Sequence, residues 1–181
     1  MMQKILIVVD MQNDFITGSL GSPQARAIVP YVKEKIKLYQ NNGDKVIFTR
    51  DTHAANYLET QEGRRLPVTH CLTGTCGHAI ADELDTAGGE IFDKPNFGSL
   101  ELANHIADNA GSPDEIELCG LCSDICVVSN ALIMKARFPE ATVTVDARCC
   151  AGVTEESHQA ALLTMKTCQV NVIGEEPPIC Q

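Results

Sequence analysis

One of the nine cysteines in this 181-residue chain occupies a position that suits a nucleophile. The apolar run 115–119 predicts a buried strand, Gly120 breaks it, and apolar residues then recur at helical spacing. Ser123 or Asp124 is expected to cap this helix, because a side-chain oxygen can accept hydrogen bonds from the unpaired N–H groups of the first turn. Cys126 then lies in that turn, where the partial positive charge of the helix N-terminus lowers the pKa of a thiol. This placement indicates acyl transfer by a thiolate.

An acid and a lysine are predicted to lie near this thiol. A thiol nucleophile needs a base that takes its proton and later returns it to a leaving group. Asp10 ends one apolar run and Lys94 follows another, so both are expected at strand ends. Asp10 could act as the base, and Lys94 would keep its carboxylate ionised and stabilise the thiolate. Either residue alone has an ordinary structural explanation, but the two together with Cys126 favour a nucleophilic active site.

A second group of residues has the composition of a metal site. Asp51 and His53 stand at the start of a long, weakly periodic segment, residues 52–78, and His70 lies further along it. One carboxylate oxygen and two imidazole nitrogens form a ligand set suited to zinc, iron or manganese. Histidines in surface loops are commonly just solvated, and the spacing alone leaves that alternative open. We expect structural roles for the remaining histidines, which are His78, His105 and His158.

These residues need a fold that brings them to one edge. The expected strands are 4–10, 45–50, 90–93, 115–119, 142–146 and 170–173, and the expected helices are 23–42, 99–109, 123–138 and 154–167. Such alternation predicts a three-layer α/β fold with a six-stranded parallel sheet, in a single domain over residues 1–181. Ligands of such sheets bind beyond the carboxyl ends of the strands. Asp10, Asp51, Lys94 and Cys126 are all expected at that edge.

Composition limits the functions to consider. The net charge of −10 argues against nucleic acid or anionic membranes as partners, and no stretch is apolar enough to span a bilayer. Residues 5–9 lack the basic flank and cleavage site of a signal peptide, so we expect a cytoplasmic protein with reduced thiols. Most cysteines are expected to be small buried hydrophobic residues, and Cys119 and Cys122 resemble half a zinc knuckle without a partner pair. Residues 175–181 are expected to be a terminal extension.

Three segments resemble the signature regions of the isochorismatase-like cysteine hydrolases, a superfamily that includes nicotinamidases and N-carbamoylsarcosine amidase. They are Val9-Asp-Met-Gln-Asn-Asp-Phe15, Phe92-Asp-Lys-Pro-Asn-Phe97 and Gly120-Leu-Cys-Ser-Asp-Ile-Cys-Val127. The resemblance implies that Asp10 is the base, Lys94 its partner and Cys126 the nucleophile. It also implies a cis peptide bond between Leu121 and Cys122, with the backbone N–H groups of Cys122 and Cys126 forming the oxyanion hole.

The resemblance also bears on the metal. Nicotinamidases carry a metal site of this form on the corresponding loop, and some similar proteins add a glutamate between the histidines. Glu62 is the best match to that glutamate here, and Glu59 is the second. The resemblance therefore implies a divalent metal held by Asp51, His53, Glu62 and His70, with zinc preferred over iron or manganese, and no organic cofactor.

The substrate wall departs from the pattern of the nicotinamidases. Many of them place an aromatic residue just before the second metal histidine, where it packs on the pyridine ring, but Leu66 occupies that position here. Phe15 is the remaining candidate for a stacking wall. The chain has no tryptophan, which puts nicotinamide as the substrate in doubt more than amide hydrolysis itself.

The resulting prediction is a metal-binding cysteine amidohydrolase that converts a small carboxamide to the acid and ammonia through a thioester on Cys126. Two alternatives stay open. One is a metal-free hydrolase of the same fold that acts on an enol ether, a carbamoyl or a ureido compound. The other is a non-enzymatic interaction domain on this scaffold. The resemblance further implies a homo-oligomer, either a dimer or a tetramer.

Overall fold

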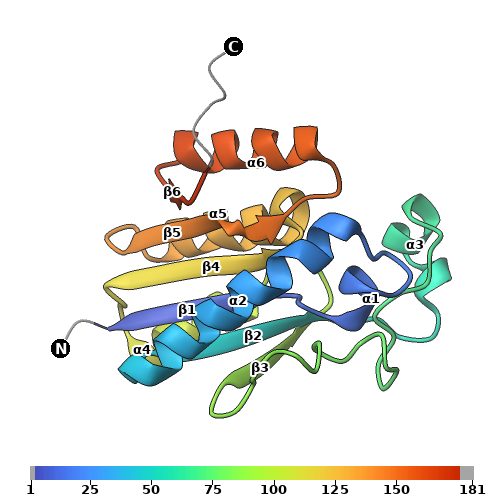
Figure 1. Cartoon of the computed structure of the whole chain (residues 1–181), viewed down its shortest axis with the longest axis horizontal. Helices are drawn as coiled ribbons and strands as arrows, with labels where there is room; N and C mark the ends of the chain where they lie inside the picture. Colours follow the sequence, from blue (N-terminus) through green and yellow to red (C-terminus); the bar gives the residue numbers. More distant parts are fainter. Residues whose placement is uncertain (1–2, 176–181) are drawn as a thin grey trace.

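Six parallel strands form a single sheet in the computed structural model, which describes residues 3–175 (Figure 1). The strands are β1 (Lys4–Val9), β2 (Lys45–Asp51), β3 (Glu90–Lys94), β4 (Glu115–Leu121), β5 (Thr142–Ala151) and β6 (Asn171–Ile173). They are ordered β3-β2-β1-β4-β5-β6, and every neighbouring pair is parallel. This confirms the predicted six-stranded parallel sheet.

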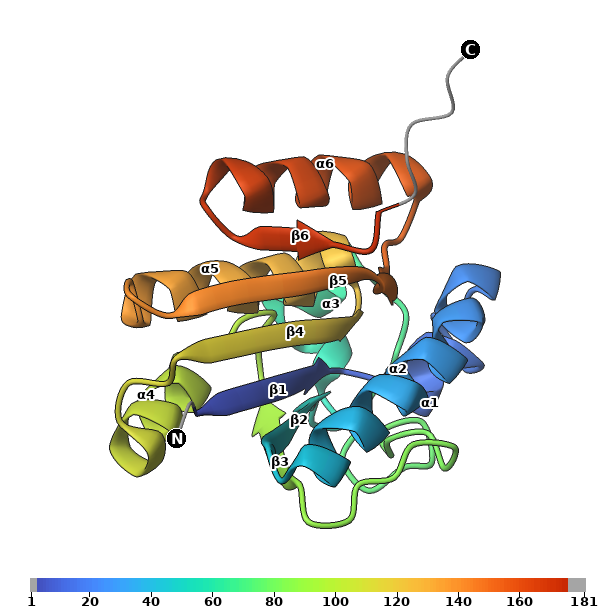
Figure 2. The same ribbon diagram turned by 60° about the vertical axis from the view of Figure 1, so that its left-hand side comes forward.

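Helices cover both faces of the sheet, as Figures 1 and 2 show. The helices are α1 (Asn13–Ile16), α2 (Pro23–Asn42), α3 (Gln61–Arg65), α4 (Leu100–Ala110), α5 (Val128–Arg137) and α6 (Glu155–Thr167). Helix α2 crosses one face, α4 and α5 lie on the other, and α6 runs beside the β5–β6 edge. The side chains from Ile5 to Val9 are completely buried, because β1 lies in the middle of the sheet between these layers.

The boundaries of α2 follow directly from its sequence. The Ser22 side chain accepts a hydrogen bond from the backbone N–H of Ala25 at 3.0 Å, and Pro23 occupies the first helical position. Gly43 ends the helix with a φ of 75°, a left-handed conformation that glycine adopts without a steric penalty. The predicted helix 23–42 is therefore confirmed.

Strand β5 is longer than the predicted strand 142–146. It continues to Ala151 and pairs with the end of β4, where Gly120 lies opposite Cys150. The exposed Arg148 interrupts the apolar pattern, and its guanidinium turns back to the carboxylate of Asp146. The apolar sequence pattern that indicates a strand is therefore interrupted at Arg148, although the pairing of β5 with β4 continues to Ala151.

The segment 52–78 contains short helical elements that the sequence did not predict. A 3₁₀ turn, η1 (Tyr57–Glu59), leads into α3. A Cβ atom at Gly63 would lie 2.1 Å from the carbonyl oxygen of Tyr57, so only glycine lets α3 pack this closely against η1. This packing holds the middle of the segment beside the carboxyl ends of the central strands.

The order of the strands reverses between β1 and β4. Strands β2 and β3 follow β1 on one side, and β4, β5 and β6 lie on the other. Parallel sheets of this kind bind ligands at such a switch point, beyond the carboxyl ends of the strands. Asp10 follows β1 directly, and the π-helical turn η2 (Ser123–Val127) follows β4 one residue after its end. The fold thus positions a site between these two segments.

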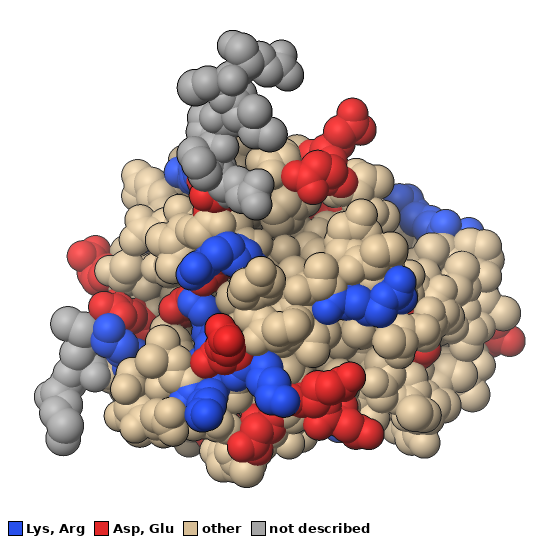
Figure 3. All heavy atoms as spheres, in the orientation of Figure 1, with Lys and Arg blue, Asp and Glu red and all other residues tan. Residues whose placement is uncertain are grey.

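The outer surface carries charges of both signs. Figure 3 shows acidic and basic side chains interspersed on the face that it presents, without one continuous basic patch. Among residues 3–175, none of the helices combines the length and the apolar character that crossing a bilayer requires. Of the predicted extension 175–181, only Glu175 is within the described residues.

Candidate active site

Asp10, Lys94 and Cys126 meet at the switch point of the sheet. The Nζ atom of Lys94 lies 2.6 Å from Oδ2 of Asp10 and 3.6 Å from Sγ of Cys126. Asp10 and Lys94 are completely buried, and Cys126 is 5% exposed. The structure thus places a carboxylate, an ammonium and a thiol in one buried contact, which is the arrangement that a base-assisted nucleophile requires.

Neighbouring strands hold the two charged residues in place. The Thr49 hydroxyl donates a hydrogen bond to Oδ1 of Asp10 at 2.6 Å, and the Asp10 backbone N–H donates to Thr49 in return. Lys94 ends β3 and also donates to the carbonyl oxygen of Asn96 at 3.0 Å. Gly120 lets the ends of β1 and β4 approach, since a Cβ atom there would lie 2.1 Å from the carbonyl oxygen of Val9. Asp10 and Lys94 therefore have little freedom to move apart.

The nucleophile lies on a π-helical turn and not on an ordinary helix start. Ile125 and Val127 both donate backbone hydrogen bonds to the carbonyl of Cys122, which occupies the N-cap position without a side-chain cap. The predicted capping by Ser123 or Asp124 is wrong, because both side chains point to partners outside this helix. The peptide bond between Leu121 and Cys122 is cis, as the family resemblance implied.

The expected low pKa of the Cys126 thiol is also wrong. Burial raises the thiol pKa well above its usual value, the carboxylate of Asp10 raises it further, and only Lys94 opposes them. Burial likewise raises the pKa of Asp10, against the effect of Lys94 and Thr49. Burial disfavours the charge of Lys94, but Asp10, Cys126 and Asp51 together outweigh it, so the pKa of Lys94 is raised. The raised pKa favours the neutral thiol of Cys126 beside the Asp10–Lys94 ion pair, so a nucleophilic role for Cys126 needs a base that accepts its proton.

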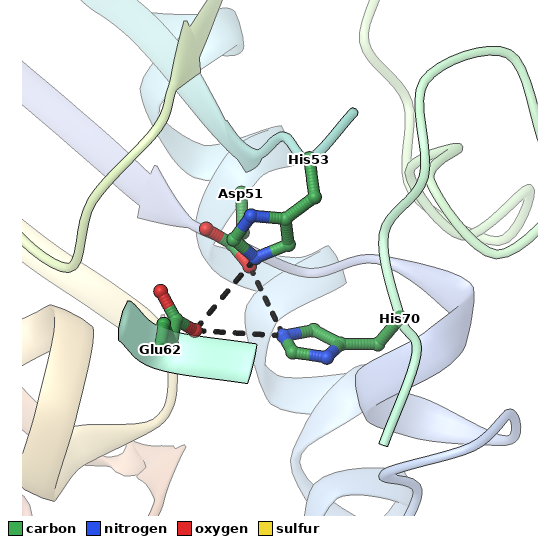
Figure 4. Close-up of side chains that lie close together, drawn as sticks. All are labelled: Asp51, His53, Glu62 and His70. Atoms are coloured by element: carbon green, nitrogen blue, oxygen red, sulfur yellow. Dashed lines mark ion pairs between the residues drawn. The ribbon is translucent and has the colours of Figure 1, made fainter. Parts of the chain in front are cut away.

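The four predicted metal ligands also come together (Figure 4). Asp51 ends β2, His53 follows it, Glu62 comes from α3, and His70 comes from the loop after α3. One ligand atom from each of the four residues lies within 4.8 Å of the other three. Nε2 of His53 is 2.8 Å from Oδ2 of Asp51, and Nε2 of His70 is 3.4 Å from the same oxygen.

The hydrogen bonding around this cluster fits a divalent cation. Nδ1 of His70 lies 2.8 Å from the Val68 carbonyl, which can only accept, so Nδ1 carries the proton and Nε2 presents its lone pair to the cluster. Within the described part of the chain, the buried Oδ1 of Asp51 has no hydrogen-bond partner, and Nε2 of His53 forms no hydrogen bond of normal geometry although it lies close to Oδ2 of Asp51. Buried polar atoms without a normal hydrogen bond are costly unless an ion satisfies them. Two imidazoles and two carboxylates suit zinc, iron or manganese.

The predicted substrate wall and the second-choice ligand lie near the metal cluster but differ in how closely they approach it. The ring of Phe15 is half-buried, with its centroid 5.6 Å from that of His70, whereas Leu66 is 38% exposed at the end of α3. Glu59, the second choice as a ligand, is exposed on η1 and is not a member of the cluster. Lys94 links the two sites, since its Nζ lies 3.9 Å from Oδ1 of Asp51.

Three residues that support the sites were missed in the sequence. Tyr57 is buried with its ring against both histidines, at centroid distances of 4.6 Å to His53 and 4.9 Å to His70. The completely buried Gln12 side chain exchanges hydrogen bonds with the backbone of Asp51, accepting at 2.7 Å and donating at 2.9 Å. Thr49 is the third. Gln12 lies within one of the family motifs, but no local sequence pattern indicates which residues Tyr57, Gln12 and Thr49 contact.

Most of the other cysteines serve as packing residues. Eight cysteines are free in the described region, and Cys71, Cys119, Cys149 and Cys150 are buried like Cys126. Within residues 3–175, the only group of His, Cys, Asp and Glu side chains close enough to hold a metal is the Asp51 cluster. Cys119 and Cys122 therefore do not form a metal site with other described residues.

Comparison with known proteins agrees with this architecture. The nicotinamidase/pyrazinamidase of Mycobacterium tuberculosis is 29% identical over 189 aligned positions, which cover 94% of this chain and 98% of that protein. The pyrazinamidase of Pyrococcus horikoshii, solved in complex with zinc, has a TM-score of 0.83 at 27% identity, with 96% of this chain and 99% of that one covered. N-carbamoylsarcosine amidase from Thermoplasma acidophilum has a TM-score of 0.81 at 25% identity, with 98% and 99% covered. A model of the isochorismatase domain matches residues 4–177, and the chain therefore belongs to the isochorismatase family.

Proposed function

We propose that this protein is a metal-binding cysteine amidohydrolase of the nicotinamidase type, which hydrolyses a small carboxamide to a carboxylic acid and ammonia. The observation that carries the proposal is the buried contact among Asp10, Lys94 and Cys126, with the Asp51 cluster next to it. Relatives that match almost the whole chain are a nicotinamidase/pyrazinamidase and a zinc-bound pyrazinamidase. The intact set of buried reactive groups argues against a purely non-enzymatic interaction domain.

The first half of the reaction uses the neutral thiol of Cys126. Sγ attacks the carbonyl carbon, and the thiol proton passes to the carboxylate of Asp10. The attack forms a C–S bond and turns the carbonyl oxygen into an oxyanion. We assign the backbone N–H groups of Cys122 and Cys126 to that oxyanion. Asp10 then gives the proton to the amide nitrogen of the substrate, and the C–N bond breaks. Ammonia departs, and the acyl group remains on Cys126 as a thioester. Lys94 keeps its positive charge throughout and stabilises the negative charge on Sγ and Asp10.

The second half returns the enzyme to its resting state. Asp10 accepts a proton from a water molecule as that water attacks the thioester carbonyl. The C–S bond breaks, the acid leaves, and the proton on Asp10 returns to Sγ of Cys126. One carboxamide and one water thus give one acid and one ammonia, without a net change in the protein.

Asp51, His53, Glu62 and His70 would hold the metal, with zinc as the first choice. When bound, the metal supplies a Lewis-acidic position that orients the substrate beside Lys94 and Cys126. Elemental analysis of protein purified without chelators should find metal in the wild type, and the double variant Asp51→Ala/His53→Ala should lose it. Glu59→Gln is the matched control, because Glu59 lies outside the cluster, and it should keep the metal. Unchanged metal content in the double variant would contradict the assignment.

A carbamoyl compound is the second candidate substrate class. The chain lacks an aromatic side chain at Leu66, and its fold matches N-carbamoylsarcosine amidase as completely as it matches the pyrazinamidase. Phe15 and Leu66 are the proposed substrate wall. An aliphatic wall at Leu66 suits a small non-aromatic amide as well as a pyridine ring.

A panel of small amides with ammonia release as the readout tests both candidates. We expect the protein to hydrolyse nicotinamide or pyrazinamide. Its kcat/KM for carbamoyl compounds should be much lower than for these amides. The variant Cys126→Ala should lose activity on every substrate, and Cys168→Ala, which changes an exposed thiol, should keep it. Residual turnover by Cys126→Ala at the wild-type rate would refute the mechanism.

We also propose a cytoplasmic protein that works as one domain and assembles as a dimer or tetramer. The free thiols support a reducing compartment, and the hydrophobic cluster that spans residues 5–170 supports one domain. The net charge of −10 supports small molecules over nucleic acid as partners. The oligomer is supported by family resemblance, and light scattering during size-exclusion chromatography tests it.

A further inference from the structure

The first two residues of the nucleophile turn η2 face α6 and not their own helix. The Ser123 hydroxyl is completely buried and lies 2.7 Å from Nδ1 of His158 on α6. Asp124 accepts hydrogen bonds from the backbone N–H of Val153 at 3.0 Å and from the Ser157 hydroxyl. The turn that carries Cys126 is therefore attached by side chains to the start of α6, which belongs to a different part of the chain.

The approach of His158 to this turn depends on the connection between β5 and α6. A Cβ atom at Gly152 would lie 2.9 Å from Cβ of His158 and 3.1 Å from its backbone, so the absence of a side chain lets α6 sit close to the end of β5. Cys150 and Ala151, the last residues of β5, pair with Gly120 and Leu121. The same stretch of β5 thus fixes both the entry into the nucleophile turn and the position of His158.

The nucleophile turn has few other side-chain contacts that could fix its start. No side chain caps its start, where backbone bonds run from Ile125 and Val127 to Cys122. The hydrogen bond that the Asn130 side chain donates to the carbonyl of Cys126 at 2.8 Å lies at the other end of the turn. Ser123 lies three residues before Cys126, so a movement of Ser123 also moves the thiol relative to Lys94. The thiol lies 3.6 Å from Lys94, a contact that a small displacement would lose.

We infer that His158 is a positioning residue for the nucleophile, and that its hydrogen bond with Ser123 holds η2 so that Cys126 stays beside Lys94 and Asp10. The expected effect on kcat rests on the proposed function, but the contact between Ser123 and His158 does not. His158 also lines a cavity of about 830 Å³ between α2 and α6, together with Tyr31, Arg148 and Gln159. Water from this cavity can solvate a truncated position 158, which makes substitution there tolerable for folding.

Substitution of His158 tests the inference. His158→Ala should lower kcat by about 10-fold to 100-fold, the effect of displacing a reacting group by about an ångström, and should leave KM nearly unchanged. His158→Asn should recover most of the rate, because the Asn amide can reach the position of Nδ1. Gln159→Ala is the matched control, since Gln159 lines the same cavity but, among the residues that the structure describes, its side chain bonds only to Glu155. Its kcat should match the wild type.

A second readout works without any substrate. The rate at which iodoacetamide alkylates Cys126, followed by mass spectrometry of the peptide that contains it, should change in His158→Ala and return toward the wild-type rate in His158→Asn. Ser123→Ala should behave like His158→Ala, and the double variant should be no worse than either single variant, because all three lose the same hydrogen bond. Thermal unfolding of each variant shows that the compared proteins are folded.

The outcomes separate this inference from the proposed function. If the wild type releases ammonia from an amide but His158→Ala has the wild-type kcat and alkylation rate, the positioning role is refuted and the amidase function stands. If the wild type turns over no amide, the alkylation rates still decide the positioning role. Additive effects of Ser123→Ala and His158→Ala would also overturn it, because they would show two independent contributions.

Discussion

Two lysines in this protein, the completely buried Lys94 and the partly buried Lys35, each lie between two carboxylates, but only Lys94 belongs to the candidate active site. Lys94 is flanked by Asp10 and Asp51, and Lys35 on α2 is flanked by Glu117 and Asp146. Their neighbours differ. Around Lys35 the Tyr39 hydroxyl donates to Glu117 at 2.7 Å, and the Arg148 guanidinium donates to Asp146 at 3.0 Å.

The hydrogen bonds of the Lys35 cluster are complete, whereas those of the Lys94 cluster are not. Within the described residues, the buried side-chain atoms that form no hydrogen bond of normal geometry are Oδ2 of Asp10, Oδ1 of Asp51 and Nε2 of His53. Two of them have a close ionic neighbour all the same, since Oδ2 of Asp10 lies 2.6 Å from Nζ of Lys94 and Nε2 of His53 lies 2.8 Å from Oδ2 of Asp51. All three belong to the candidate active site, and none belongs to the Lys35 cluster. Buried groups with complete hydrogen bonding stabilise a fold, and groups left incomplete are available to a substrate, a proton or a metal. Composition alone would not distinguish the two lysines.

The largest expected difference between the clusters is in catalysis. Asp10→Asn removes the carboxylate that forms the ion pair with Lys94, and an amide cannot accept the thiol proton. We expect kcat to fall by about 10²-fold to 10⁴-fold, the usual contribution of a general base. Ammonia release under saturating amide measures it. A variant that kept the wild-type kcat would show that Asp10 is only a structural partner of Lys94.

The matched change in the other cluster should affect stability instead. Asp146 is as deeply buried as Asp10, and Oδ2 of Asp146 lies 2.8 Å from Nζ of Lys35. Asp146→Asn removes the charged partner of Arg148 and one of the two carboxylates beside Lys35, which keeps Glu117. We therefore expect the free energy of unfolding to fall by about 2 kcal/mol, the contribution of hydrogen bonds to a charged group. Urea unfolding measures this loss. The kcat should stay at the wild-type value, and a loss as large as that of Asp10→Asn would remove the distinction between the clusters.

The sequence predicted that the three candidate catalytic residues meet, because each of them has a local signal. Asp10 and Lys94 end apolar runs that must be strands, and Cys126 follows a strand by a short turn, so the rule for parallel sheets is enough to bring them together. The family motifs gave the same residues. The cluster of four candidate metal ligands was predicted in the same way, from spacing and resemblance combined.

The contacts that complete the site have no local signal. Thr49 and Gln12 find their partners 39 positions away in the sequence, and Tyr57 packs on two histidines in a segment without periodicity. Ser123 and Asp124 looked like caps of the nearest helix, because the sequence does not show that α6 lies beside them. Lys35 has the pattern of any surface lysine on an amphipathic helix, and only the sheet beneath it makes it a partly buried ion pair.

The two aspartates should also respond to pH in opposite ways. Burial raises the pKa of Asp10 above 3.8. Burial also opposes ionisation of Asp146, but Arg148 and Lys35 outweigh it and lower its pKa below 3.8. An acid with a lowered pKa in the folded state stabilises the fold above its unfolded pKa, and that stability is lost as the pH falls through the folded value. Asp10 must be ionised to act as a base.

We therefore expect the acid limb of kcat/KM to lie at a higher pH than that of a free aspartate, with activity falling as the pH drops through the raised pKa of Asp10. Stability should fall in a lower pH range, as Asp146 becomes protonated. A pH–rate profile and urea unfolding at several acidic pH values measure the two ranges. In Asp146→Asn the free energy of unfolding should depend less on pH below about 4, because the titrating carboxyl is gone. The acid limb of kcat/KM should stay at the same pH as in the wild type. Coinciding ranges in the wild type would contradict the assignment of the two aspartates.

The smallest expected effect comes from a single hydrogen bond in the Lys35 cluster, the one that the neutral Tyr39 hydroxyl donates. Tyr39 is 7% exposed, and Tyr39→Phe removes the hydroxyl that donates to Glu117 while the ring keeps its packing. Glu117 retains Lys35, so we expect the free energy of unfolding to fall by about 1 kcal/mol, less than for Asp146→Asn. Tyr31→Phe is the control on the same helix, because Tyr31 is 51% exposed, and it should leave stability unchanged. A loss for Tyr39→Phe as large as that for Asp146→Asn would mean that the hydroxyl, and not the charge on Lys35, sets the stability of the cluster.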